Sequence, residues 1–127
     1  MIKKCFIGAV CGIIIAAIMV LLLFKAEKIT IGVFSLTEYQ NYIEKFPSSQ
    51  TVEPVGTAEE AVAVAQEIWG NAYGKDILFL KSYKVFFDAE NKVWLVMEDL
   101  PMYMSGGVPY ILIEKETGKI LAVWHDK

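Results

Sequence analysis

The chain has 127 residues, 55% of them hydrophobic, and a formal net charge of −3, so it has room for one small domain. Residues 29–127 hold eight lysines, no arginine and fourteen carboxylates, a net charge of −6. This balance argues against a basic groove for nucleic acid, because phosphate contacts need clustered Lys and Arg. It suits a basic protein partner, although an acidic surface is also a common means of staying soluble.

The first predicted element is residues 5–24, twenty apolar positions without a charge. A helix of that length rises about 30 Å, the thickness of a bilayer core. A signal-peptide core is shorter, about 7–15 residues, and ends at a small-residue cleavage site that is missing here. We therefore predict that residues 1–28 are an uncleaved single-pass anchor, with a cleaved signal peptide or a buried soluble helix as alternatives. Cys5 and Cys11, the only cysteines, lie in this segment, so no disulfide braces the rest.

Charges beside the apolar segment predict its orientation. Lys3 and Lys4 precede it with the amino terminus, whereas Glu27 partly offsets Lys25 and Lys28 behind it. The positive-inside rule then leaves the N-terminus in the cytoplasm and places the C-terminal domain on the extracytoplasmic side.

Residues 29–56 are predicted to hold a short helix and a linker. Residues 29–34 form an apolar lead-out, and Ser35 with Glu38 has the form of a capping box for the helix. The apolar side of this helix repeats at helical spacing in Leu36, Tyr39, Ile43 and Phe46. Residues 47–56 are rich in Pro, Ser and Gly, so we expect a linker and a domain boundary there.

A longer helix is predicted over residues 57–73. Thr57 and Glu60 form a second capping box, and Gly74 is a natural helix stop. Apolar residues fill most of the circumference of the helix, so a sheet is expected to cover it.

Four strand-like runs follow in quick succession, at residues 82–87, 92–98, 108–114 and 119–125. The turn at residues 115–118 ends in Gly118, which supplies a positive φ. We predict an α+β domain over residues 57–127, with one long helix packed on a curved antiparallel sheet of three to four strands.

The residues that would support catalysis are sparse. His125 is the only histidine, and Glu98 is followed by Asp99, whose side chain points to the opposite face of a strand. No phosphate-binding glycine motif and no zinc-ligand spacing is present. We predict no catalytic residue, no cofactor and no metal site.

The loop at residues 101–107 contains the most distinctive motif of the chain. Gly106 and Gly107 allow a bulge or tight turn before the third strand. Met102, Tyr103, Met104 and Tyr110 flank them, and such side chains also form adaptable surfaces for a protein partner. Both roles remain open at this point.

Residues 57–127 resemble the bacterial immunity-protein family that has a nuclear-transport-factor-2-like fold. The motif and candidate partner-binding residues are Trp94, Pro101, Tyr103, Gly106, Gly107, Pro109, Tyr110 and Gly118. The resemblance implies a reduced form of that fold behind the anchor. It also implies a non-catalytic protein that neutralises a cognate toxin by stoichiometric binding, with no small-molecule ligand.

Two alternatives to an immunity function remain. The helix, the strands and the terminal hairpin also resemble peptidase-propeptide domains of the PepSY type, which inhibit envelope proteases. A small enzyme with a pocket inside the fold is the third possibility, and the missing His and carboxylate constellation argues against it.

Overall fold

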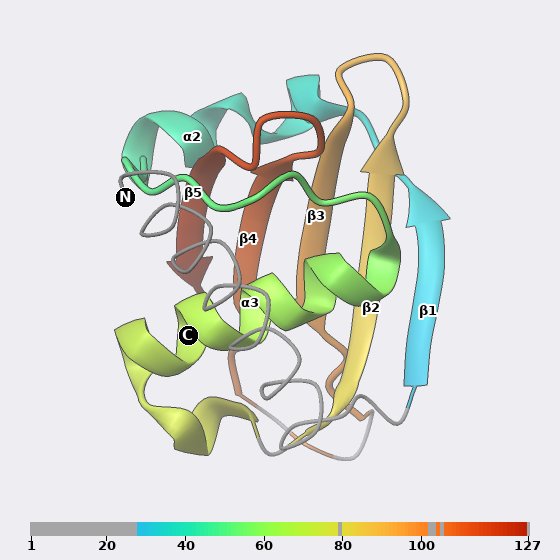
Figure 1. Cartoon of the computed structure of the whole chain (residues 1–127). Coiled ribbons are helices and arrows are strands. Elements are labelled where there is room, and N and C mark those ends of the chain that lie inside the picture. The colour runs from blue at the N-terminus through green and yellow to red at the C-terminus, as the bar shows by residue number, and fades with distance from the viewer. Residues whose placement is uncertain (1–27, 79, 102–103, 105, 127) are drawn as a thin grey trace, which may run out of the picture.

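The computed structural model describes residues 28–78, 80–101, 104 and 106–126. One strand and a run of helices come first, and four consecutive strands follow (Figure 1). In chain order the elements are β1 (Lys28–Val33), the 3-10 helix η1 (Leu36–Tyr39), α2 (Gln40–Lys45), α3 (Ala58–Tyr73), the 3-10 helix η2 (Lys75–Leu78), β2 (Ser82–Asp88), β3 (Val93–Glu98), β4 (Pro109–Glu114) and β5 (Ile120–His125). The predicted long helix and four strands are thus confirmed to within a residue at most ends.

The five strands form a single mixed sheet in the order β1-β2-β3-β4-β5. β2 to β5 are antiparallel neighbours, as the short connections predict, but β1 runs parallel to β2. The expectation of three to four antiparallel strands is therefore wrong by one strand. The additional strand is β1, which is formed by the residues predicted to be an apolar lead-out. The connection from β1 to β2 contains both α-helices, and a connection of that length can bring a strand back parallel to its predecessor.

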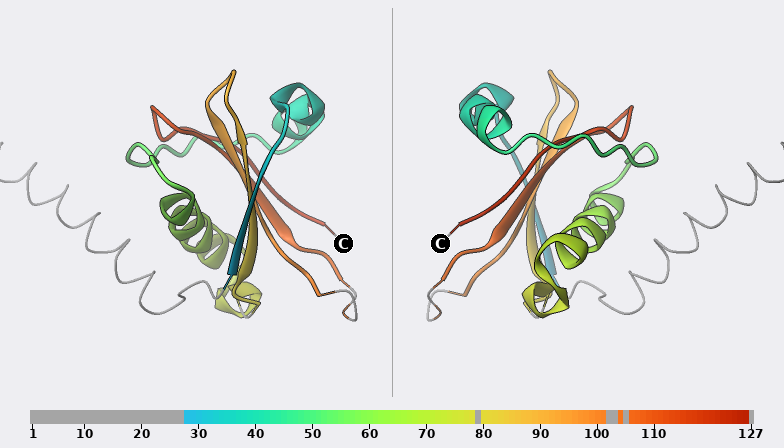
Figure 2. Two further views of the ribbon diagram at one scale, coloured as in Figure 1. Left: turned by 90° about the vertical axis from the view of Figure 1, so that its right-hand side faces the viewer. Right: turned by 90° about the vertical axis from the view of Figure 1, so that its left-hand side faces the viewer.

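Helix α3 packs across one face of the sheet, and α2 lies over the other face (Figure 2). The Thr57 hydroxyl accepts a hydrogen bond from the Glu60 amide at 3.1 Å, and Gly74 ends the helix with a φ of 90°. Both predicted ends of α3 are confirmed. Its buried side includes Val62 and Trp69, which join the core cluster of this face.

The predicted capping box at Ser35 is wrong. The Ser35 side chain makes no capping hydrogen bond and pairs instead with the Thr37 hydroxyl at 2.7 Å. The free amide of Leu36 donates to the Asp88 carboxylate, at 2.7 Å, from the end of β2. A carboxylate from a distant strand thus replaces the local serine, and it attaches η1 and α2 to the sheet.

Residues 47–56, predicted to be a linker, pack against the sheet. Pro47 forms an isolated bridge to Ala122 of β5, Thr51 forms one to Lys119 just before β5, and the Ile120 amide donates to the Gln50 carbonyl at 3.0 Å. The segment then crosses in front of the strands toward α3 (Figure 1), and the side chain of its Val55 is buried. Its prolines and serines prevent regular structure, but the β4–β5 hairpin forms hydrogen bonds with several of its backbone amides and carbonyls.

No helix within the described part of the chain is long and apolar enough to cross a membrane. The predicted anchor, residues 5–24, lies outside the described residues and stays a prediction.

Candidate functional site

Trp94 belongs to the hydrophobic core. Its side chain is buried, and the indole N–H donates to the Val55 carbonyl at 2.8 Å. The ring of Phe87 lies 4.6 Å away, centroid to centroid. Trp94 therefore holds residues 47–56 against the sheet, and no partner can reach it without rearrangement.

Gly118 is needed for close packing. It has a φ of 72°, and a Cβ at this position would overlap the Val52 carbonyl oxygen. The Val52 amide donates to the Gly118 carbonyl at 2.8 Å, so the two backbones lie in direct contact. The predicted positive φ is confirmed, and the contact with Val52 explains why glycine is required there.

The loop between β3 and β4 is described at residues 99–101, 104 and 106–108. The Met104 amide donates to the Pro101 carbonyl at 3.0 Å, and Gly106 has a φ of 131°. Gly107 follows, half-buried, and Pro109 begins β4 opposite His125. Tyr103 lies outside the described residues, so its role as a contact stays a prediction.

Tyr110 connects this loop to a second group of aromatic residues. Its ring stacks on Trp124 with centroids 5.1 Å apart and planes 6° from parallel. Its hydroxyl donates to the Asp126 carboxylate at 2.6 Å. Burial, followed by the adjacent carboxylate of Asp126, raises the pKa of the Tyr110 hydroxyl, so it stays a donor at neutral pH.

Around Trp124 lies an open hollow of about 370 Å³, between α2 and the end of β5. Tyr42 stacks on Trp124 at 4.5 Å, and the Phe46 ring lies 6.4 Å from it. Tyr42 is 38% exposed and Phe46 is 41% exposed, which is high for aromatic side chains. We call this surface the aromatic hollow; it is lined by Asn41, Tyr42, Lys45, Phe46, Trp124, His125 and Asp126.

The aromatic surface continues around the edge of the sheet. Tyr73, at the end of α3, is 41% exposed, and its ring meets His125 edge-on at 5.4 Å. His125 therefore lies between the aromatic hollow on one face and Tyr73 on the other. An aromatic centre with a polar rim is the composition of a protein-binding surface.

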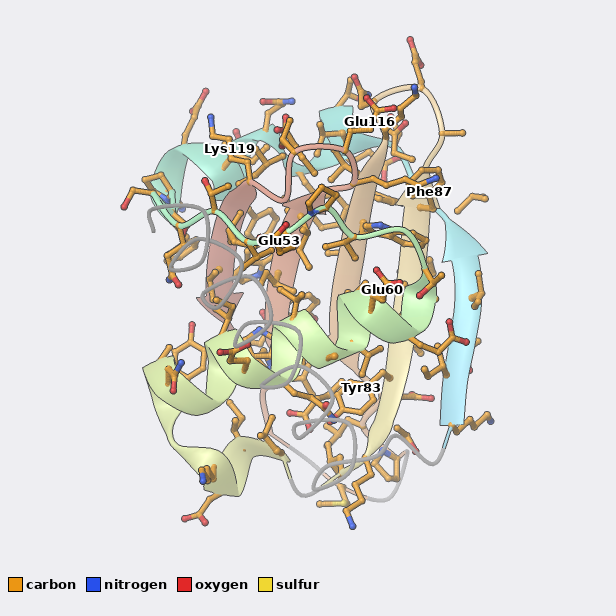
Figure 3. The ribbon with its side chains drawn as sticks, viewed as in Figure 1. Glu53, Glu60, Tyr83, Phe87, Glu116 and Lys119 are labelled. Carbon is orange, nitrogen blue, oxygen red and sulfur yellow. The ribbon has the colours of Figure 1, made fainter. Side chains whose placement is uncertain are left out.

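A buried polar group lies elsewhere, beneath α3. Glu98 is 3% exposed, accepts a hydrogen bond from the Leu80 amide, and has a second oxygen without a partner among the described residues. Its Cα is paired with Tyr83, which Figure 3 shows behind α3 and whose hydroxyl accepts from Gln66 at 3.0 Å. Burial raises the pKa of Glu98 to about 7.

Asp99 points away from this group and lies 3.8 Å from the Lys84 ammonium. Glu98 and Asp99 thus belong to opposite faces of the sheet, and His125 lies at its far edge. The structure does not bring these three residues into one pocket. Among the described residues, no three His, Cys, Asp or Glu side chains are grouped to hold a metal ion.

Sequence reasoning missed the exposed rings of Tyr42 and Tyr73, and it missed the buried Trp124 on which Tyr42 stacks. The spacing of Tyr39, Tyr42 and Phe46 contains a signal, because i, i+3 and i+7 positions gather three aromatic rings on one side of a short helix. The contribution of Trp124 needs the tertiary structure, since it lies 82 residues beyond Tyr42 in the chain.

A family model described as "NTF2 fold immunity protein" matches residues 60–127, more than half of the chain. No curated protein and no solved structure matches the chain. The matched residues contain most of α3 and all of β2 to β5, and therefore Trp124. They leave out β1 and α2, and with them Tyr42 and Phe46.

Proposed function

Because the chain belongs to the family of NTF2 fold immunity proteins, we propose that it binds a cognate bacterial toxin and neutralises it by stoichiometric contact, without catalysis. Occlusion of the toxin's active surface is the simplest mechanism for such a small domain. It requires a rigid patch that presents large side chains to solvent.

The aromatic hollow is the observation that supports this proposal. Exposed, clustered aromatic side chains are unusual on a monomeric surface and supply much of the energy at protein interfaces. Trp124 is fixed by Tyr110 and by its strand, so Tyr42 and Phe46 pack on a preorganised base. Preorganisation reduces the entropy lost on binding.

The charge of the domain suggests the chemistry of the partner. Residues 29–127 have a net charge of −6, and Asp126 lies at the rim of the aromatic hollow. A basic toxin surface would be attracted to such a domain and would associate faster at low ionic strength.

The location of the domain is also a proposal. The apolar segment at residues 5–24 is long enough to span a bilayer, and its flanking charges favour a cytoplasmic N-terminus. We propose that residues 1–28 anchor the domain at the outer side of the cytoplasmic membrane, where an incoming toxin would first meet it.

Co-expression tests the proposal. The toxin candidate is a large modular protein encoded beside this gene, and the readout is survival of cells that make it with or without this chain. Purified proteins should form a 1:1 complex by titration calorimetry. Death of the cells that make both proteins, or the lack of any complex, would overturn the immunity function.

A second comparison tests the surface. The double variant Tyr42→Ala with Phe46→Ala should lose protection, whereas Glu67→Ala, at an exposed position on α3, should keep it. Circular dichroism of each variant establishes that it is folded. Full protection by the double variant would assign toxin binding to another surface.

A further inference from the structure

The two edges of the sheet differ sharply. The outer edge of β5 is covered by residues 46–51, through backbone hydrogen bonds such as Val123 to the Phe46 carbonyl at 3.2 Å. At the opposite edge, β1 has a strand on one side only within the described part of the chain (Figure 1). Free backbone donors and acceptors of an edge strand are a template for another strand.

Apart from Lys28 at its start, β1 lacks the charges and prolines that usually protect an edge. Residues 29–34 contain no charge and no proline. Ile31 is 64% exposed and Val33 is 86% exposed, the two most exposed large hydrophobic side chains of the described chain. Both belong to the face that carries α3, since they are paired in register with Val85 and Phe87.

The close fit of β1 on β2 shows that the strand is a built part of the sheet. Gly32 lies on Phe86 so closely that a Cβ there would come within 2.7 Å of the ring. Ile29 packs into the core cluster beneath α3. Figure 3 shows Phe87 at the end of β2 beside β1, so the apolar surface continues from one strand to the next.

We infer that β1 pairs antiparallel with β1 of a second copy of this chain, about a twofold axis at Ile31, so that two five-stranded sheets join into one. In this register Ile31 lies opposite Ile31 of the second copy, and Val33 lies opposite Ile29. All these side chains are on the same face, because directly opposite residues share a face of a sheet. The exposed apolar row of each copy is thereby covered by the other.

The lack of charge in residues 29–34 favours pairing with β1 of a second copy over pairing with a charged strand of another protein. The domain is acidic overall, so most pairs of its surfaces repel one another, but residues 29–33 of β1, at the centre of the proposed contact, carry no charge. Lys28 lies opposite Phe34 of the second copy in this register. The two copies of Lys28 are then six residues apart along the ladder, roughly 20 Å, which leaves them fully screened.

Disulfide trapping in the full chain tests the register. Cys5 and Cys11 are replaced by serine, the protein is held in detergent micelles, and a cysteine is introduced by Ile31→Cys. Directly opposite Cα atoms lie about 4.5–5.5 Å apart, within the span of a disulfide. We expect oxidation to give a covalent dimer as the main product.

Thr30→Cys and Glu67→Cys are the matched controls. Both positions are exposed, but Thr30 belongs to the other face of β1 and lies opposite Gly32 of the second copy, and Glu67 lies on α3. We expect at least tenfold less dimer from either control. Equal cross-linking of the three variants, or none with Ile31→Cys, overturns the proposed pairing.

Ile31→Lys tests the same interface without a cross-link. The side chain is largely exposed, so the fold should tolerate lysine, while two lysines at the axis would repel each other. Sedimentation should show a dimer for the starting protein and a monomer for the variant. If Ile31→Lys sediments with the same mass as the starting protein, the inference is overturned. Loss of protection against toxin at that unchanged mass would assign the β1 edge to the toxin instead.

Discussion

The ring of Tyr42 stacks on the indole of Trp124, with centroids 4.5 Å apart and planes 21° from parallel. This contact joins a short helix near the start of the fold to the last strand of the sheet. It also forms the base of the aromatic hollow, so the position of α2 and the shape of the proposed binding surface depend on the same pair of rings.

Tyr42→Ala should weaken toxin binding strongly. A buried aromatic hot spot typically contributes about 2 kcal/mol or more, which is roughly a 30-fold loss of affinity. Tyr42→Phe keeps the stacked ring and should bind within about threefold of the starting protein. Titration calorimetry with the toxin measures both, and equal affinity of Tyr42→Ala and Tyr42→Phe would remove this ring from the interface.

Among glycine-to-alanine substitutions in turns, Gly118→Ala should lower the free energy of unfolding the most. The new Cβ would overlap the Val52 carbonyl, and the positive φ adds backbone strain, for a total of about 2–4 kcal/mol. Gly106→Ala is the matched control, because its φ is 131° but nothing lies within 4 Å of the new atom. Urea unfolding should give Gly118→Ala a clearly lower free energy of unfolding than Gly106→Ala. The reverse order would contradict the close packing of Gly118 against Val52.

Glu98 should make the domain less stable as the pH rises. Its pKa is about 7 in the folded state and 4.5 for an ordinary glutamate, so between these values the folded state binds more protons than the unfolded state. The stabilising contribution of protonated Glu98 is fully present below about pH 4.5, falls through this window by at most about 3 kcal/mol, and is lost above pH 7. Glu98→Gln removes the titrating proton and should flatten the profile of unfolding free energy against pH from 4.5 to 7; a slope equal to that of the starting protein would assign the titration elsewhere.

Much of this fold is predictable because its signals are local. The capping residue Thr57 and the stop at Gly74 define α3 without any tertiary contact. The strands β2 to β5 follow one another with no helix between them in the described part of the chain, so neighbours in sequence are neighbours in the sheet. Positive φ at Gly118 likewise follows from the turn that contains it.

The features that escaped prediction depend on residues far apart in the chain. β1 is a strand only because β2, some fifty residues later, supplies its hydrogen-bonding partner. The aromatic hollow combines α2 with the end of β5, whereas the predicted site followed the glycine loop, which is conspicuous in sequence. Tyr110 is the residue at which the predicted and the observed surfaces meet.

The carboxylate of Asp88 should control the attachment of η1 and α2. The side chain and the backbone amide of Asn91, and then the Leu36 amide, lower the pKa of Asp88 to about 2 through hydrogen bonds. The ionised group therefore stabilises the fold above pH 3.8, its ordinary value, and this contribution is lost as the pH falls toward 2.

Asp88→Ala should consequently lower the melting temperature at pH 7, with a smaller difference from the starting protein near pH 2. The freed Leu36 amide would loosen α2, so the Tyr42–Trp124 contact should weaken and the fluorescence of tryptophan should change. Asp76→Ala, at an exposed carboxylate on η2, is the control and should leave the melting temperature and the fluorescence unchanged. If Asp88→Ala melts like the control at pH 7, the carboxylate does not hold α2 in place, and the aromatic hollow is organised by its ring contacts alone.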